Sequence, residues 1–338
     1  VVEVKDDQYP VERKYGGPEY ETVGAFGSCC GVDDIKVTAY ASQLCNANGL
    51  DSIGAGVTIS CAMECYEHGL LTQADTDGID LRFGNGEAVI AALKKIIARE
   101  GFGNLLAEGS KRLTDKIGGD APKYAMQVKG QEIAMHDPRT KYGHALGVAV
   151  SPTGADHMHS VHDTAYQTKA GVAILEPVGI HEPLPWDDLS LDKVRMVRYA
   201  IMWRVGMNMT GVCMFHPWTP QQTMDLIAAA TGWNTSVMDL WLAGERAYDM
   251  ARAFNAREGF GPEDDWLPER FFTGVAEGPV AGRGLNRERF AQAIQEWYAL
   301  NGYDPRTACP TRAKLQDLGV GWVADKVEEA KGCKSLDL

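Results

Sequence analysis

The sequence predicts a mainly α-helical protein of two domains, with short irregular or β pieces between the helices. Three observations favour this fold class. Capped segments of helical length recur along the chain, from the Asp33 and Asp34 pair to the C-terminal tail. The chain has neither the glycine-rich fingerprint of a dinucleotide-binding sheet nor a phosphate-binding loop sequence. Its 338 residues exceed a typical single domain and suffice to bury a large core.

The expected elements follow in chain order. Residues 1–20 are polar and interrupted by glycine and proline, which is typical of an extended segment or a loop. Asp33 and Asp34 supply an N-cap for the first helix, and Gly49 supplies its C-cap. We expect further helices at residues 53–70, 87–100, 105–117, 191–205, 220–231, 236–254 and 286–300, and a charged terminal helix within 321–332.

The composition changes after the first third of the chain. Between Met126 and Val150, valine, glycine, proline and histidine are frequent, and no clear period of 3.6 residues remains. We therefore place one helical domain at residues 1–126 and a second at residues 127–338.

Charge and cysteine usage limit the function classes. Acidic residues outnumber basic residues by 46 to 33, and this net charge of −13 disfavours binding to nucleic acid or to an anionic membrane. No apolar run reaches the ~20 residues that span a bilayer. Residues 1–7 are charged, unlike a signal peptide, and lack Met, so we expect a processed or incomplete chain. Eight cysteines in so long a chain favour reduced thiols and a cytoplasmic protein.

Two distant segments share one pattern. The segments from Asn46 to Asp51 and from Asn208 to Cys213 read Asn, two variable residues, Gly, a branched aliphatic residue, and then an acid or a thiol. Such a sequence suits a turn that exposes backbone N–H groups, and two copies suggest a ligand with two similar polar halves. Helix C-caps are the simpler interpretation of either copy alone, because glycine commonly ends helices.

A pair of acids lies near the N-terminus. Glu19 and Glu21 flank Tyr20, directly after two glycines and a proline. In an extended backbone both carboxylates would face one side and one of them could reach into a cleft. A solvated acidic loop is the simpler interpretation, because acidic side chains are usually exposed.

Histidines and one cysteine are the other candidates for chemistry. Three of the eight histidines, His157, His159 and His162, lie within six residues. The cluster favours a divalent-metal site or a proton-shuttling imidazole, against the alternative of surface or hydrogen-bonded buried histidines. Cys213 lies in an apolar stretch, where a lone cysteine is more often a core side chain than a ligand.

Seven segments together resemble the tungsten-pterin aldehyde:ferredoxin oxidoreductase family, in its C-terminal region. They occur in the family's order and cover nearly the whole chain, which makes the match specific although each segment alone is weak. They are GPEYET at 17–22, LCNANGLDS at 44–52, AMECYE at 62–67, REGFG at 99–103, LAEGS at 106–110, DPR at 137–139 and GVC at 211–213.

The resemblance implies two helical domains that close over a bis-molybdopterin centre of tungsten or molybdenum, with a [4Fe-4S] cluster beside one pterin. These are the C-terminal domains of the family's fold. The β-rich N-terminal domain that seats the pterins is absent from this sequence, as is the C-x-x-C-x-x-x-C motif that supplies the other three cluster ligands. The resemblance therefore implies that the chain is inactive without the missing N-terminal part.

The resemblance also assigns site residues. Glu21 matches the acid beside the metal, His157 matches the proton-handling histidine, and Cys213 matches the last cluster ligand. Asn replaces the family's usual Asp at the start of each turn, which keeps hydrogen bonding but removes a charge. His136 stands where some members have Tyr, and His159 stands where a pterin-contacting Lys is found. The implied pterin contacts are Asn46, Gly49, Leu50, Asp51, Asn208, Gly211 and Val212.

The implied activity is oxidation of a small aldehyde to a carboxylic acid, with electrons passing through the cluster to ferredoxin or an iron–sulfur electron-transfer subunit. A homo-oligomer is compatible with the sequence. Three alternatives stay open: a tungsten-dependent reductase subunit for aromatic acyl-CoA thioesters of the benzoyl-CoA type, a zinc hydrolase that uses His157, His159 and His162 with Asp156 or Asp163, and a non-catalytic scaffold subunit.

Overall fold

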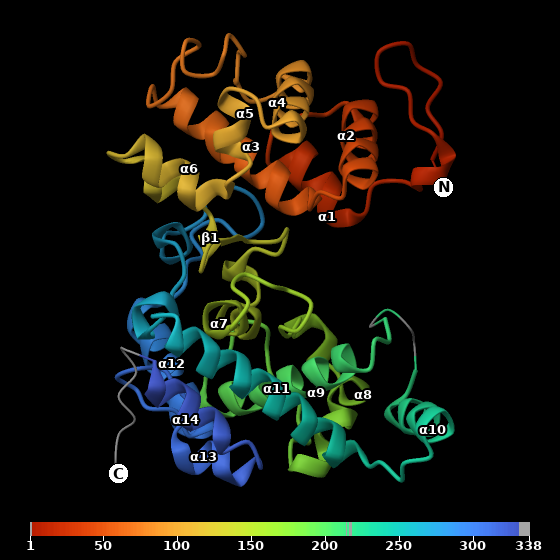
Figure 1. Cartoon of the computed structure of the whole chain (residues 1–338), viewed down its shortest axis with the longest axis vertical. Coiled ribbons are helices and arrows are strands. Elements are labelled where there is room, and N and C mark those ends of the chain that lie inside the picture. The colour runs from red at the N-terminus through yellow and green to blue at the C-terminus, as the bar shows by residue number, and fades with distance from the viewer. Residues whose placement is uncertain (1, 214, 216–217, 331–338) are drawn as a thin grey trace. The chain divides into compact units, whose positions relative to one another are not determined.

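The chain folds into two mainly helical units, as the sequence predicts (Figure 1). The structure is a computed structural model that describes residues 2–213, 215 and 218–330. Unit 1 comprises Val1–His136 with Pro268–Arg270, and unit 2 comprises Asp137–Leu267 with Phe271–Leu338. In the described residues the only sheet is a two-stranded antiparallel hairpin, β1 (Gln127–Val128) and β2 (Gln131–Glu132).

Unit 1 is built around one buried helix. Cys61 and Cys65 share a face of α3 and are buried together with Ile59 and Met63 in the core that α2, α4, α5 and α6 complete. Both cysteines are therefore small core side chains, which is the usual place of a free cysteine. The helices of unit 1 are α1 (Tyr20–Val23), α2 (Ile35–Asn48), α3 (Ser52–Glu67), α4 (Gly86–Ala98), α5 (Phe102–Leu106) and α6 (Gly109–Ile117).

The hairpin belongs to unit 1 because a buried carboxylate joins it to two helices. Glu132 accepts hydrogen bonds from the backbone N–H of Ser110 at 2.7 Å, from its hydroxyl at 2.8 Å and from the Thr58 hydroxyl at 3.3 Å. These donors satisfy a carboxylate that would be costly to bury alone. Unit 1 thus extends to His136, whereas the change in composition placed the boundary at residue 126.

Unit 2 is a bundle in which two long helices pack along each other. α9 lies against α11, and α7 and α12 also pack on α9. Trp297, Tyr248 and Phe290 are among its largest fully buried side chains. The helices are α7 (Tyr142–Val150), α8 (Lys169–Val172), α9 (Leu191–Met209), α10 (Pro220–Thr231), α11 (Val237–Arg257), α12 (Arg287–Asn301), α13 (Arg312–Asp317) and α14 (Trp322–Glu329).

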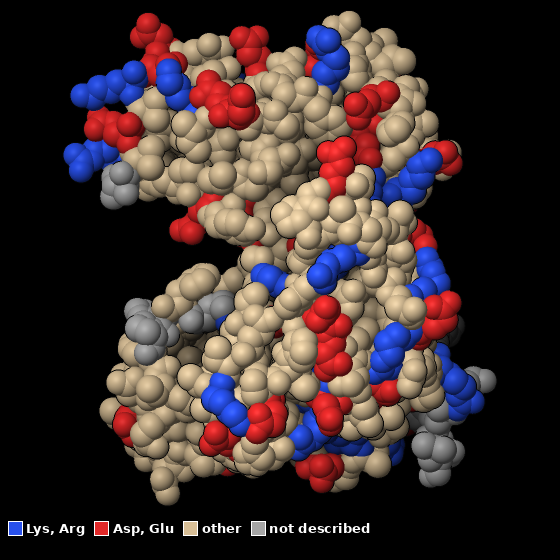
Figure 2. Space-filling view, turned by 180° about the vertical axis from the view of Figure 1, so that it is seen from behind, with Lys and Arg blue, Asp and Glu red and all other residues tan. Residues whose placement is uncertain are grey.

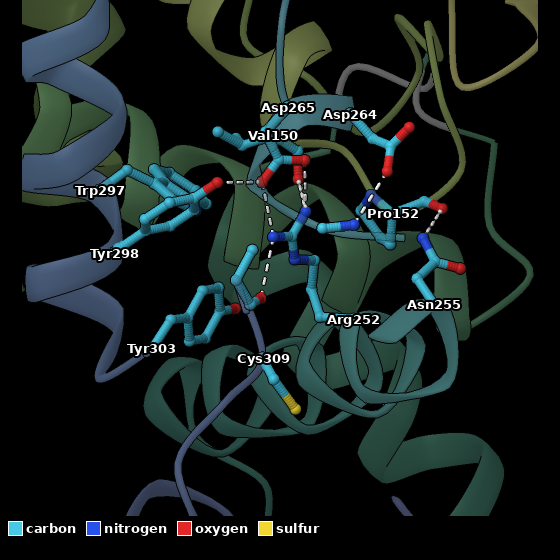
Figure 3. Close-up of polar contacts among 12 residues, drawn as sticks. Val150, Pro152, Arg252, Asn255, Asp264, Asp265, Trp297, Tyr298, Tyr303 and Cys309 are labelled. Carbon is cyan, nitrogen blue, oxygen red and sulfur yellow. Dashed lines mark hydrogen bonds and ion pairs between the residues drawn. The ribbon is translucent and has the colours of Figure 1, made fainter. Parts of the chain in front are cut away.

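A buried polar network in unit 2 fixes the backbone that follows α7 (Figure 3). Arg252 of α11 binds Asp265 through two parallel contacts of 2.7 and 2.6 Å. The same guanidinium donates to the Val150 carbonyl at 3.1 Å, and the Tyr298 hydroxyl of α12 donates to Asp265 at 2.6 Å. Bidentate pairs of this kind are strong and directional. The network therefore anchors the end of α7, directly before the histidine segment.

Three expectations differ from the structure. The predicted helix 105–117 is two helices, because Gly109, the first residue of α6, has a φ of 86° that interrupts the run. α7 was not predicted, since Gly143 through Val150 are all buried and a helix without a polar face shows no 3.6-residue period. Glu19 is extended but Glu21 lies on α1 with a side chain 14% exposed, so the favoured solvated acidic loop is wrong for Glu21: the chain turns helical at Tyr20. Of the predicted terminal helix, residues 331 and 332 lie outside the described residues.

Charge is mixed on the surface. Figure 2 shows acidic and basic side chains interspersed over both units on the face in view. Among the helices that the structure describes, none has the length and apolar character that crossing a bilayer requires.

Candidate functional site

Glu21 is held by a second segment of unit 1 that lies 114 residues away in sequence. Its Oε2 accepts a hydrogen bond of 2.7 Å from the Met135 N–H, and the Tyr20 hydroxyl donates to the Met135 carbonyl at 2.8 Å. His136 Nε2 lies 3.0 Å from Glu21 Oε1, and its ring stacks on Tyr20 with centroids 5.6 Å apart. We call Tyr20, Glu21, Met135 and His136 the carboxylate clasp.

Two side chains of the clasp are mostly buried, whereas Tyr20 is 64% exposed. The side chains of His136 and Glu21 are 17% and 14% exposed, so their contact is shielded from bulk water. The Cys29 thiol is close by, with Sγ 3.4 Å from Met135 Sδ. Burial, and then the negative charge of Glu21, raises the pKa of Cys29 above its usual value. This thiol therefore stays protonated at neutral pH and is not a nucleophile.

The first glycine turn joins two helices of unit 1. Gly49 has a φ of 65° and ends α2, while Asp51 begins α3 by accepting from the N–H groups of Ile53 and Gly54 at 3.1 and 3.0 Å. Asn46, in the last turn of α2, donates from its amide to the Tyr15 carbonyl at 3.1 Å. The carboxylate of Asp51 is thus used as a helix cap, which accounts for its place in the pattern without a ligand.

The second turn ends α9 in unit 2. Thr210 bonds the Met207 carbonyl through its hydroxyl at 2.7 Å, and Gly211 has a φ of 73°. Cys213, which closes the pattern, is exposed. The simpler interpretation is therefore confirmed for both copies, since each glycine ends a helix in the left-handed conformation. This geometry does not exclude pterin binding, and the pterin contacts stay a prediction.

An apolar pocket of about 630 Å³ lies beside the second turn. Met209, Thr210 and Val212 form one part of its lining, and residues of α10, of α11 and of the segments next to these helices form the rest. Its size falls within the ~300–1,000 Å³ of small-molecule sites. Sequence reasoning missed it, because the lining comes from three separate helices. The other aromatic and aliphatic lining residues include Trp218, Leu226, Ile227 and Trp233.

The histidine segment does not form a three-histidine metal site. His159 is buried, with Nε2 2.9 Å from the Ser151 hydroxyl and Nδ1 2.9 Å from Asp156 Oδ2. Both of its ring nitrogens are occupied, so it cannot donate a lone pair to zinc. His157 and His162 meet edge to face with ring centroids 6.2 Å apart. The predicted zinc site of His157, His159 and His162 is therefore wrong.

Asp163, the other acid considered as a zinc ligand, has a structural role. It is fully buried, accepts from the backbone N–H groups of Gly143 and His144 at 3.2 and 2.9 Å, and lies 2.7 Å from Lys193 Nζ. It thus caps the start of α7 and neutralises a buried lysine. The pair joins residues 30 positions apart, and the sequence gives no signal for it.

The described residues fit part of the cofactor set that the resemblance implies. A [4Fe-4S] cluster takes four cysteine thiolates. Cys213 is exposed, whereas the other described cysteine of unit 2, Cys309, is buried, so the described part of unit 2 offers one accessible thiol. At Gly49 and Gly211 an added Cβ would meet nothing within 4 Å, so both turns leave open space beside the backbone. One turn and Glu21 lie in unit 1, and the other turn, His157 and Cys213 lie in unit 2.

Comparison with known proteins agrees with this partial fit. The family model described as aldehyde ferredoxin oxidoreductase, domains 2 and 3, matches residues 1–320. The tungsten-containing aldehyde ferredoxin oxidoreductase of Pyrococcus furiosus is 33% identical over 321 residues, which are 93% of this chain and 50% of that protein. The enzyme of the same name from Pyrococcus horikoshii is 34% identical over 313 residues, 90% of this chain and 49% of that protein.

Two further similar proteins have names that describe other substrates. A WOR-like subunit of an aliphatic sulfonate oxidoreductase from Pyrococcus furiosus is 29% identical and spans 95% of this chain and 48% of that protein. The active-site complex BamBC of benzoyl coenzyme A reductase, solved with 1,5-dienoyl-CoA, shares the fold with a TM-score of 0.67 at 21% identity, over 92% of this chain and 50% of that chain. The chain spans about half the length of the relatives it matches, and it belongs to the aldehyde ferredoxin oxidoreductase family, in the region of domains 2 and 3.

Proposed function

We propose that this chain is the C-terminal part of a tungsten- or molybdenum-dependent oxidoreductase that converts aldehydes to carboxylic acids. Electrons leave through a [4Fe-4S] cluster to ferredoxin or to an iron–sulfur electron-transfer subunit. The observation that carries the proposal is the carboxylate clasp. Its mostly buried acid, at the position that matches the family's acid beside the metal, has Oε2 hydrogen-bonded to the Met135 N–H and Oε1 3.0 Å from His136 Nε2. The relatives at 33% and 34% identity are named for aldehyde oxidation, which supports the substrate class.

In this proposal a bound tungsten bis-molybdopterin centre supplies the two-electron redox chemistry. Glu21 accepts a proton from water or substrate, and its fixed orientation suits that role because general bases act only at hydrogen-bonding reach. His157 binds the carbonyl oxygen of the substrate and exchanges a proton. The two glycine turns, which begin at Asn46 and Asn208, each hold one pterin with their backbone, and Cys213 ligates the cluster.

The test uses the whole protein, with the N-terminal part that precedes these two domains in the relatives. We expect tungsten or molybdenum together with iron by elemental analysis, and aldehyde-dependent reduction of ferredoxin. Glu21→Gln lowers the turnover at least ~10-fold with unchanged metal content, because acid–base groups typically contribute ~10²–10⁴-fold. Glu19→Gln, the exposed acid two residues away, is the matched control and leaves turnover within about twofold of wild type.

Three outcomes contradict the proposal. Stoichiometric zinc without tungsten or molybdenum removes the redox assignment. Reduction of an aromatic acyl-CoA thioester without aldehyde oxidation would identify the protein as part of an aromatic acyl-CoA reductase instead. Wild-type turnover in Glu21→Gln removes this residue from proton transfer.

A further inference from the structure

The clasp brings two backbone segments of unit 1 into direct contact. At Gly24, one turn after Tyr20, an added Cβ would lie 2.3 Å from Met135 Cγ, so only glycine lets the segments approach this closely. The other side is anchored too, because Met135 follows the hairpin that the buried Glu132 holds to α3 and α6. The partners of Glu21 are therefore presented by a constrained backbone.

Each oxygen of the Glu21 carboxylate faces a different nitrogen. Oε2 accepts from the Met135 N–H at 2.7 Å, and Oε1 lies 3.0 Å from His136 Nε2. The imidazole is itself oriented by stacking on Tyr20, whose hydroxyl bonds the Met135 carbonyl. In unit 1 the Cys29 thiol also lies beside the carboxylate, and it stays protonated and adds no charge. The hydrogen bond fixes Oε2, and the imidazole beside Oε1 restricts rotation of the carboxylate.

We propose that His136 is the positioning residue of Glu21: together with the Met135 N–H it keeps the carboxylate in one orientation. The value of this orientation for catalysis rests on the proposed function, while the clasp itself requires neither metal nor substrate. Misplacement of a reacting group by about 1 Å can cost ~10²-fold in rate, so a residue that fixes a proton acceptor contributes without touching the substrate.

Three variants of the 338-residue chain distinguish the effect of the ring nitrogen of His136 from the effect of its ring stacking. His136→Phe keeps a ring to stack on Tyr20 but removes the nitrogen near Oε1. His136→Gln restores an N–H donor of similar reach without the ring. His68→Phe is the matched control, because His68 also stacks on a tyrosine of unit 1, Tyr124, with centroids 4.9 Å apart.

The direct readout is hydrogen exchange of the Met135 amide, which reports the bond from this N–H to Glu21. We expect exchange about tenfold faster in His136→Phe, because the carboxylate loses one of its two anchors. The rate returns to within about threefold of wild type in His136→Gln and is unchanged in His68→Phe. Unchanged exchange in His136→Phe, or equal acceleration in His136→Phe and His136→Gln, would overturn the proposal.

A reciprocal measurement keeps the proposal testable if His136→Phe does not fold. In Glu21→Gln the ring-nitrogen resonance of His136 should move, because its partner loses a negative charge, whereas that of His68 should stay. A His136 resonance that does not move contradicts the contact.

Turnover of the whole enzyme separates this inference from the proposed function. If His136 positions Glu21, His136→Phe lowers kcat with unchanged metal content and His136→Gln recovers most of it. If the whole protein contains neither tungsten nor molybdenum and does not turn over aldehydes, the proposed function is refuted. The hydrogen-exchange data still test the clasp in that case. If the Met135 amide of His136→Phe exchanges faster as expected but its kcat equals that of wild type, only the positioning role of His136 is refuted.

Discussion

The two glycine turns share a sequence pattern and a backbone conformation but differ in what surrounds them. Gly49 and Gly211 have φ values of 65° and 73°, and each ends a helix. In the first turn both polar side chains have partners within unit 1, since Asn46 bonds the Tyr15 carbonyl and Asp51 caps the following helix. The second adjoins an apolar pocket and ends in an exposed thiol, Cys213.

This difference separates the local role of the pattern from its role in a site. The left-handed glycine is required wherever a helix ends in this way, so the pattern by itself indicates a C-cap. The two turns differ at the sixth position of the pattern: the Asp51 carboxylate caps its own helix, whereas Cys213 has a free and exposed thiol. The second turn is therefore the better candidate for a role beyond local structure.

The sharpest way to test the comparison is to remove the sixth residue of the second turn. In the whole protein, Cys213→Ser should lose most of the cluster, because thiolate ligation holds iron–sulfur centres. Iron content and the electron paramagnetic resonance signal of the reduced protein measure the loss. Cys309→Ala, which removes the buried thiol of unit 2, should keep both at wild-type levels. An unaltered signal in Cys213→Ser would make the two turns equivalent.

The stability of unit 2 should depend on pH through one buried carboxylate. Asp249 lies on α11, which also lines the pocket, and burial raises its pKa to about 7 despite the hydrogen bond from the Tyr303 hydroxyl. Between the ordinary value of 3.8 and about 7 the folded state binds one more proton than the unfolded state. Stability contributed by this group is therefore complete below about pH 4, falls as the pH rises to about 7, and then stays constant.

Chemical denaturation of wild type and Asp249→Asn at several pH values measures this effect. The asparagine keeps an acceptor for Tyr303 but does not titrate. The difference in unfolding free energy, wild type minus variant, should decrease between pH 4 and 7 and stay level above. Lys314, Glu245 and Arg198 also act on Asp249, so the same series is run with Lys314→Met, which should move the pH range upward because a favourable positive charge is lost. A pH-independent difference would contradict the raised pKa.

The glycines themselves should respond equally. Gly49→Ala and Gly211→Ala should each lower the unfolding free energy of their unit by about 1 kcal/mol, because alanine is strained at positive φ. Space is not the cause, since a Cβ meets nothing within 4 Å at either site. Denaturation midpoints of the 338-residue chain provide the measurement. A cost at one site more than twice that at the other would show that the two turns are not locally equivalent.

Local chemistry was predictable from the sequence, and the clasp was not. Asp34 and Gly49 cap α2 as their identities indicate, and Ser236 begins α11 with a capping box. These motifs act within one helical turn, so a single sequence contains their partners. The segments of the clasp lie more than a hundred residues apart, and only the folded unit brings Met135 and His136 to Glu21.

For the histidine segment, the sequence predicted a metal site that the structure does not form. Three imidazoles within six residues favoured a shared metal, but spacing does not decide where ring nitrogens point. Ser151 and Asp156 occupy those of His159, and the buried network around Arg252 holds the backbone that places Ser151 there. Contacts of this kind depend on packing between helices, which residue types in one segment do not encode.

The smallest expected effect concerns the cap of the first turn. Asp51→Ala should destabilise unit 1 by about 1 kcal/mol, because the N–H groups of Ile53 and Gly54 lose their acceptor. Asp51→Asn keeps an acceptor oxygen and should cost only a few tenths of a kcal/mol. If Asp51 also contacts a pterin in the whole protein, Asp51→Asn should reduce pterin content while stability stays close to wild type. Full pterin content in Asp51→Asn, with destabilisation in Asp51→Ala, would show that Asp51 acts only as a helix cap. The two turns would then differ in that only Cys213 takes part in binding a cofactor.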